Sequence, residues 1–276
     1  MGMPLQSTSR SSNRIVEKFA SDKLWPMTSG DTGSSLADRA QSRDPEELLA
    51  VASDLALTED LALALLVRRD LPPNVIEAIS KNAAVVKLRK VNFAIASHPR
   101  APRHVSLPLA RHLYTFELVK IALLPAVPAD VKVGIDETIL SRLTQISEGE
   151  RLTLARQASG RVAGALLLDP QERVIQTALR NSKMTESIVL KALSQKKVTA
   201  RTVLAICSHE KWSRRRDIQL ALLRNEHTPL AEAIQFASGF PAHLLREVLS
   251  LSRLQASITN YLLNSLDRRA PGEGES

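Results

Sequence analysis

The residues best suited to chemistry in this chain are a tryptophan and the basic side chains around it. They are Lys211, Trp212, Arg214, Arg215 and Arg216. An indole ring among cations could stack on a nucleic-acid base while the charges contact phosphates. The same cations could instead contact an acidic protein surface. A third interpretation packs Trp212 between two structural units and leaves the arginines as a solvated face.

Charge is distributed unevenly along the chain, whose formal net charge is +8 at pH 7. Between positions 196 and 224, eight basic residues oppose two acidic ones, a balance of +6, whereas positions 36–60 hold seven acids and two arginines, a balance of −5. We expect a protein partner with an acidic surface to bind the basic part, and nucleic acid is the alternative partner. Head-to-tail self-association of the basic and acidic parts is a third hypothesis. The predicted partner-binding residues are Lys196, Lys197, Lys211, Trp212, Arg214, Arg215 and Arg216.

The remaining reactive side chains follow no catalytic or metal-binding pattern. The sequence contains no glycine-rich phosphate loop, no His-Glu-x-x-His and no Gly-x-Ser-x-Gly. Cys207 shares an apolar stripe with Val203, which predicts a buried structural thiol. His98, His112 and His209 lack partners at zinc-ligand spacing and precede helix starts, so we interpret them as helix terminators. We expect a protein that is not an enzyme and holds no metal or cofactor.

A repeated pattern of short helices must position these side chains. In each unit a Pro, Thr or Ser is followed three or four residues later by an apolar pair, and by a second pair one helical turn further on. The capping positions are Pro45, Thr58, Pro72, Pro102, Thr115 and Pro128, then Pro170, Thr185, Thr199, Ser213, Thr228 and Pro241. Each unit predicts a helix of about ten residues, too short to be stable alone. Stacking of such helices predicts about 14 residues per helix and about 28 per two-helix repeat.

The pattern predicts one all-α repeat domain over 36–266, and the aromatic content of 3% also favours helices over sheets. Its middle, near 129–160, is irregular: we expect a longer helix reaching Leu143, then a helix opened by the capping box of Ser147 and Glu150. The segments 1–35 and 267–276 are predicted to be disordered tails.

Location and assembly are less constrained by the sequence. No apolar stretch is long enough to span a membrane, and the one cysteine cannot form an internal disulfide. We therefore expect a cytoplasmic protein with no membrane partner. Its oligomeric state has no signature in the sequence.

The loop phrases carry a resemblance to a known architecture. The stretches 98–102 with Val105, 181–185 with Ile188, and 225–229 resemble the loops of armadillo-type or HEAT-like α-solenoids. The short capped units also resemble leucine-rich-repeat-variant proteins. The resemblance covers about residues 44–266 and implies a right-handed α-solenoid that serves as a binding scaffold. Some HEAT-like members are DNA glycosylases, but the carboxylate among aromatic residues that they require has no match here.

Overall fold

The computed structural model describes residues 35–269; the tails expected at 1–35 and 267–276 lie outside them except for Ser35 and residues 267–269. The described residues form seventeen α-helices and one 3-10 helix, with no strand, which confirms the all-α prediction. The last helix runs to Arg269, three residues past the expected domain end. The elements are α2 (Leu36–Arg39), α3 (Pro45–Ser53), α4 (Glu59–Val67), α5 (Pro73–Lys81), α6 (Arg89–Ser97), α7 (Arg103–Ala110), α8 (Thr115–Leu123), α9 (Ala129–Arg142), α10 (Glu148–Gln157), α11 (Gly160–Ala165), η1 (Leu166–Leu168), α12 (Glu172–Leu179), α13 (Glu186–Leu193), α14 (Ala200–Cys207), α15 (Arg216–Leu222), α16 (Leu230–Ser238), α17 (Ala242–Ser250) and α18 (Ala256–Arg269).

Most helices begin where the capping pattern predicts. Thr58 is the N-cap of α4, and its hydroxyl oxygen accepts a hydrogen bond from the Leu61 backbone N–H at 3.3 Å. The Ser147–Glu150 capping box is present at the start of α10. The long helix of the irregular middle, α9, ends at Arg142, and Leu143 is its C-cap. The sequence therefore located both features of the irregular middle correctly.

Two of the expected helix starts are misplaced near the basic segment. The N-cap of α15 is Arg215 rather than Ser213, because the residues before it form hydrogen-bonded turns around Trp212. The N-cap of α16 is Pro229 rather than Thr228. The Thr228 side chain is buried, and its hydroxyl donates to the carbonyl oxygen of Leu222 at 2.7 Å.

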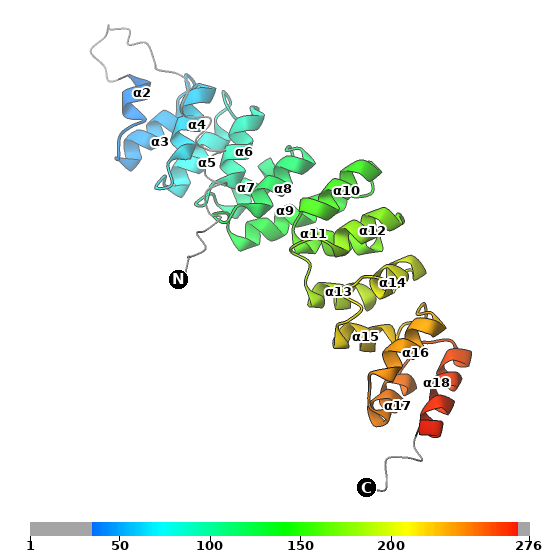
Figure 1. Ribbon diagram of the computed structural model, residues 1–276. Coiled ribbons are helices and arrows are strands. Elements are labelled where there is room, and N and C mark those ends of the chain that lie inside the picture. Colours follow the sequence, from blue (N-terminus) through cyan, green and yellow to red (C-terminus); the bar gives the residue numbers. More distant parts are fainter. Residues whose placement is uncertain (1–34, 270–276) are drawn as a thin grey trace, which may run out of the picture.

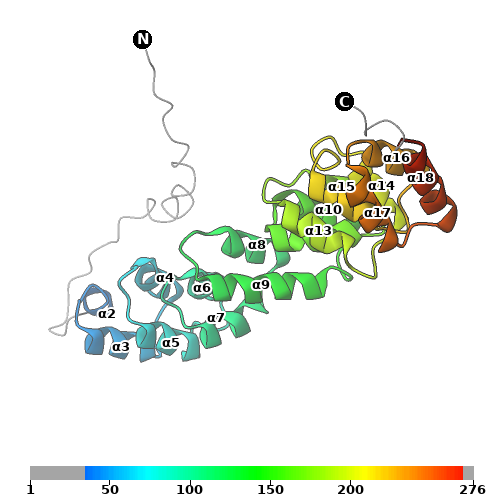
Figure 2. The same cartoon turned by 90° about the horizontal axis from the view of Figure 1, so that it is seen from below.

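The helices form two rows along an elongated molecule, with α2 and α18 at opposite ends (Figure 1). Helices two positions apart in the chain pack against each other, as α3 does with α5, α4 with α6, α11 with α13 and α12 with α14. Figure 2 shows α3, α5 and α7 in one row, with α4 and α8 on the other side. Aliphatic side chains between the rows supply most of the core, which forms two clusters, one between Ala40 and Val105 and one between Ala96 and Leu266. Among the described residues, no helix has the length and apolarity needed to cross a membrane.

A hydrogen-bond motif recurs at the helix ends with a period of 28 residues. A side-chain oxygen or a histidine Nδ1 accepts the backbone N–H of the residue two positions later. Positions 54 and 82 are 28 residues apart, as are 181 and 209, while 42 and 98, and likewise 169 and 225, are separated by two such steps. The acceptors are Ser42, Asp54, Asn82, His98, Asp169, Asn181, His209 and Asn225. This spacing equals the repeat length expected from the sequence.

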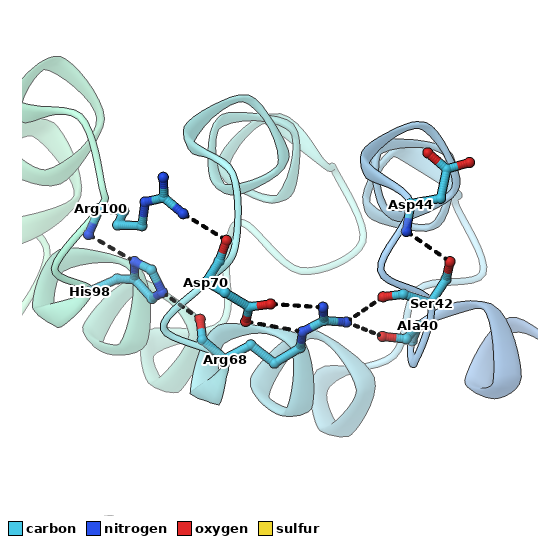
Figure 3. Close-up of polar contacts among 7 residues, drawn as sticks. All are labelled: Ala40, Ser42, Asp44, Arg68, Asp70, His98 and Arg100. Atoms are coloured by element: carbon cyan, nitrogen blue, oxygen red, sulfur yellow. Dashed lines mark hydrogen bonds and ion pairs between the residues drawn. The ribbon is translucent and has the colours of Figure 1, made fainter.

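Several of these side chains also connect one unit to the preceding unit. Asn82 Nδ2 donates to the carbonyl oxygens of Ala52 at 2.9 Å and Asp54 at 2.7 Å. His98 is the C-cap of α6, and its Nε2 lies 2.9 Å from the Arg68 carbonyl oxygen (Figure 3). Because His98 Nδ1 accepts a backbone N–H, its proton must lie on Nε2, which donates. The prediction of a helix terminator is confirmed for His98, although its bond reaches the neighbouring unit.

Arginine side chains extend the same connection along this edge. Arg68 Nη1 donates to the carbonyl oxygens of Ala40 at 3.0 Å and Ser42 at 2.7 Å, and Arg100 Nη1 donates to that of Asp70 at 2.7 Å. Figure 3 shows these contacts running across three successive loops. The loop carbonyls that the short helices leave free are thereby paired, which fixes each unit against the next.

Candidate partner-binding surface

Four of the predicted binding residues lie in or beside one loop and are exposed. Lys211, Arg214 and Arg215 occupy the loop between α14 and α15, and Arg216 is the first residue of α15. We call these four residues the α14–α15 basic loop. Only Arg214 among them has an ion-pair partner in the described residues, Glu210 at 3.4 Å, and both side chains are more than three-quarters exposed. The loop therefore presents positive charge that the chain itself does not neutralise.

Trp212 lies beneath this loop rather than on its surface. Its side chain is 2% exposed, and its Nε1 donates to the carbonyl oxygen of Leu179, at the end of α12, at 2.9 Å. The ring is therefore not available to stack on a base, and of the three interpretations the one that packs Trp212 between units describes its position. Its buried bond fixes the loop that carries the four cations.

Two of the cations lie close to aromatic rings. Lys211 Nζ is 4.1 Å from the centroid of the Trp212 ring, and the guanidinium carbon of Arg216 is 5.3 Å from that of the Phe240 ring. Cation–π attraction restrains a side chain without neutralising its charge. These two cations are held in place and remain able to pair with an external anion.

Lys196 and Lys197 do not join this loop. Both are exposed in the connection between α13 and α14, at the opposite end of α14. The eight residues of α14 separate the two ends by about 12 Å along the helix axis. The structure thus divides the predicted set between the two edges of the molecule.

Arg180, which sequence reasoning missed, lies near the α14–α15 basic loop. It is the exposed C-cap of α12, one unit before α14. The Trp212 indole bonds the carbonyl oxygen of Leu179, the residue before Arg180, so the loop lies against this end of α12. The pKa of His209 is lowered, first by burial and next by the positive charge of Arg180. Arg180 precedes Ser208, the C-cap of α14, by 28 residues. The repeat period was the sequence signal that could have identified it.

Cys207 and the histidines do not form a reactive centre. Cys207 is 6% exposed, as predicted, and burial raises the pKa of its thiol to about 12, so a reactive thiolate is scarce at neutral pH. His112 is exposed beyond the end of α7, and His209 Nδ1 accepts the Lys211 backbone N–H. Across the span 35–269, no three His, Cys, Asp or Glu side chains are grouped to hold a metal ion.

Comparison of the chain with protein-family models, with curated proteins and with solved structures found no match of any of the three kinds.

Proposed function

We propose that this protein is a non-enzymatic, cytoplasmic scaffold built as a right-handed α-solenoid, and that it binds an acidic protein surface through the α14–α15 basic loop and Arg180. The observation that carries the proposal is the set of exposed cations on a loop anchored by buried Trp212, with two exposed carboxylates, Glu210 and Asp217, beside them. The 28-residue motif supports the solenoid assignment. Complementary charge would speed association with an acidic partner and make binding sensitive to salt.

An acidic protein fits these observations better than a nucleic acid does. Base stacking needs an accessible ring, and Trp212 is buried. The arginines and lysines could still pair with phosphates, so an oligonucleotide belongs in the test as a competitor. Lys196 and Lys197, at the other edge, would contribute only to a partner that spans the length of α14.

The test compares a folded acidic probe with oligonucleotides. Negatively supercharged green fluorescent protein is titrated with the chain at two salt concentrations, and single-stranded and duplex oligonucleotides are titrated in parallel. The variant R214E/R215E/R216E should lower affinity for the acidic protein by about tenfold or more. The control R69E/K87E/K120E changes charge equally at three other exposed sites and should have an effect of about twofold or less.

Two results would reject the proposal. One is equal binding of the acidic protein by the loop variant and the control. The other is that the chain binds an oligonucleotide more tightly than the acidic protein, and that the loop variant but not the control loses this binding. That result would favour nucleic acid as the partner. A third variant, K196E/K197E, shows whether both ends of α14 take part.

A further inference from the structure

A second candidate binding site is a groove of about 590 Å³ between α7 and α9. Arg103, Leu107 and Arg111 line one side of it at intervals of four residues. On the other side, Gly134 lies against Leu107, so close that a Cβ there would be 2.7 Å from Leu107 Cδ2. The two helices therefore approach closely at the centre, and an apolar side chain lies between two cations.

The positive charge of this groove is largely unpaired. Its one carboxylate, Glu137, pairs with Arg161 on α11 at 3.0 Å. A third arginine, Arg142, is already engaged, because Nη1 and Nη2 donate to the carbonyl oxygens of Leu113 and Arg111, each at 2.8 Å. Arg103 and Arg111 are exposed and have no ion-pair partner among the described residues. Two guanidinium groups are thus available to a ligand at the ends of the groove.

The hydroxyl groups of the groove can accept hydrogen bonds from a ligand. Thr138 Oγ1 donates to the Gly134 carbonyl oxygen at 2.9 Å, and Ser141 Oγ donates to that of Thr138 at 2.8 Å. While these bonds are made, the lone pairs of both oxygens are left to accept an N–H. A peptide backbone offers such N–H groups, whereas a sugar–phosphate backbone does not.

The spacing of the two arginines fits an extended peptide. Eight residues of helix place Arg103 and Arg111 about 12 Å apart along the axis of α7. Side chains four residues apart in an extended chain lie on one face, about 13 Å apart. We propose that the groove binds an extended acidic peptide segment of a partner protein, with carboxylates four residues apart that pair with Arg103 and Arg111. The site is separate from the α14–α15 basic loop and does not depend on its function.

The proposal is tested with two fluorescein-labelled peptides of equal composition in a glycine, alanine and serine background. One has two glutamates four positions apart, and the other has them adjacent. Fluorescence anisotropy should show about fivefold tighter binding of the spaced peptide. The variant R103Q/R111Q should bind the spaced peptide about tenfold more weakly. The single variants R103Q and R111Q should each show a smaller loss of affinity. The control R69Q/R173Q, at exposed arginines outside the groove, and the variant R214E/R215E/R216E should stay within about twofold.

Several outcomes of the peptide titrations would overturn the inference. They are equal affinity for the two peptides, undiminished binding by all three groove variants, loss of binding in the α14–α15 loop variant, and no binding of either peptide to the unaltered chain at millimolar concentration. Tighter groove-dependent binding of an oligonucleotide of equal charge would likewise overturn it. Urea midpoints of all variants confirm that each compared chain is folded.

Discussion

Asn181 provides a direct test of the connection between units. Its Nδ2 donates to the carbonyl oxygens of Ala155 at 2.8 Å and Ala158 at 3.3 Å, and its Oδ1 accepts the Lys183 N–H at 2.8 Å. The residue is 4% exposed, so water cannot readily replace these bonds. Asn181→Ala removes three hydrogen bonds worth about 1 kcal/mol each. We expect the free energy of unfolding to fall by about 3 kcal/mol.

Urea unfolding followed by circular dichroism measures this loss, and hydrogen exchange locates it. The Lys183 amide, which loses its acceptor, should exchange faster in the variant. The same substitution at exposed Asn260 in α18 is the matched control and should change stability by about 0.5 kcal/mol or less. If Asn181→Ala costs no more than Asn260→Ala, these bonds do not stabilise the contact between units. Asn181→His, which introduces the side chain found one unit later at His209, should cost less than the alanine variant.

Three further predictions concern buried groups and close contacts. Burial lowers the pKa of His98 below 6.5, so the unfolded chain binds a proton before the folded chain does as pH falls. The free energy of unfolding should therefore decline below about pH 6.5, and His98→Asn should reduce that decline in urea titrations. An unchanged dependence of the unfolding free energy on pH in the variant would contradict this. In Gly160→Ala, the new Cβ would lie 2.5 Å from a loop carbonyl oxygen, so unfolding free energy should drop by about 1–3 kcal/mol, whereas Gly149→Ala, with nothing within 4 Å, should not destabilise. Cys207 should react with Ellman's reagent only at the rate of unfolding; fast labelling of the native chain would refute its burial.

Much of the fold follows from local rules that the sequence displays. Capping residues such as Thr58 and Pro102 start helices where they were expected, because a short helix needs its first amides paired or absent. The rule fails at Ser213, where burial of the Trp212 ring against α12 decides the loop conformation. That contact joins residues 33 positions apart and has no local signature.

The candidate surfaces follow less directly from the sequence, because proximity along the chain is not proximity in space. Lys197 and Lys211 belong to one charge run, yet α14 lies between them. Arg180 lies outside the predicted set, but its neighbour Leu179 contacts Trp212 of the loop. The groove between Arg103 and Thr138 lies between α7 and α9. The irregular spacing in the middle of the sequence does not predict how these two helices are aligned. Each of these relations requires the packing of one unit on the next.

We propose that the α14–α15 basic loop is the surface that binds an acidic partner. Hydrogen exchange of the chain, measured with and without negatively supercharged green fluorescent protein, tests it most directly. We predict slower exchange in residues 208–216 and around Arg180 when the probe is bound, with residues 194–201 unchanged. Binding that slows exchange only in 194–201, or only in units distant from α12 to α15, would contradict the claim.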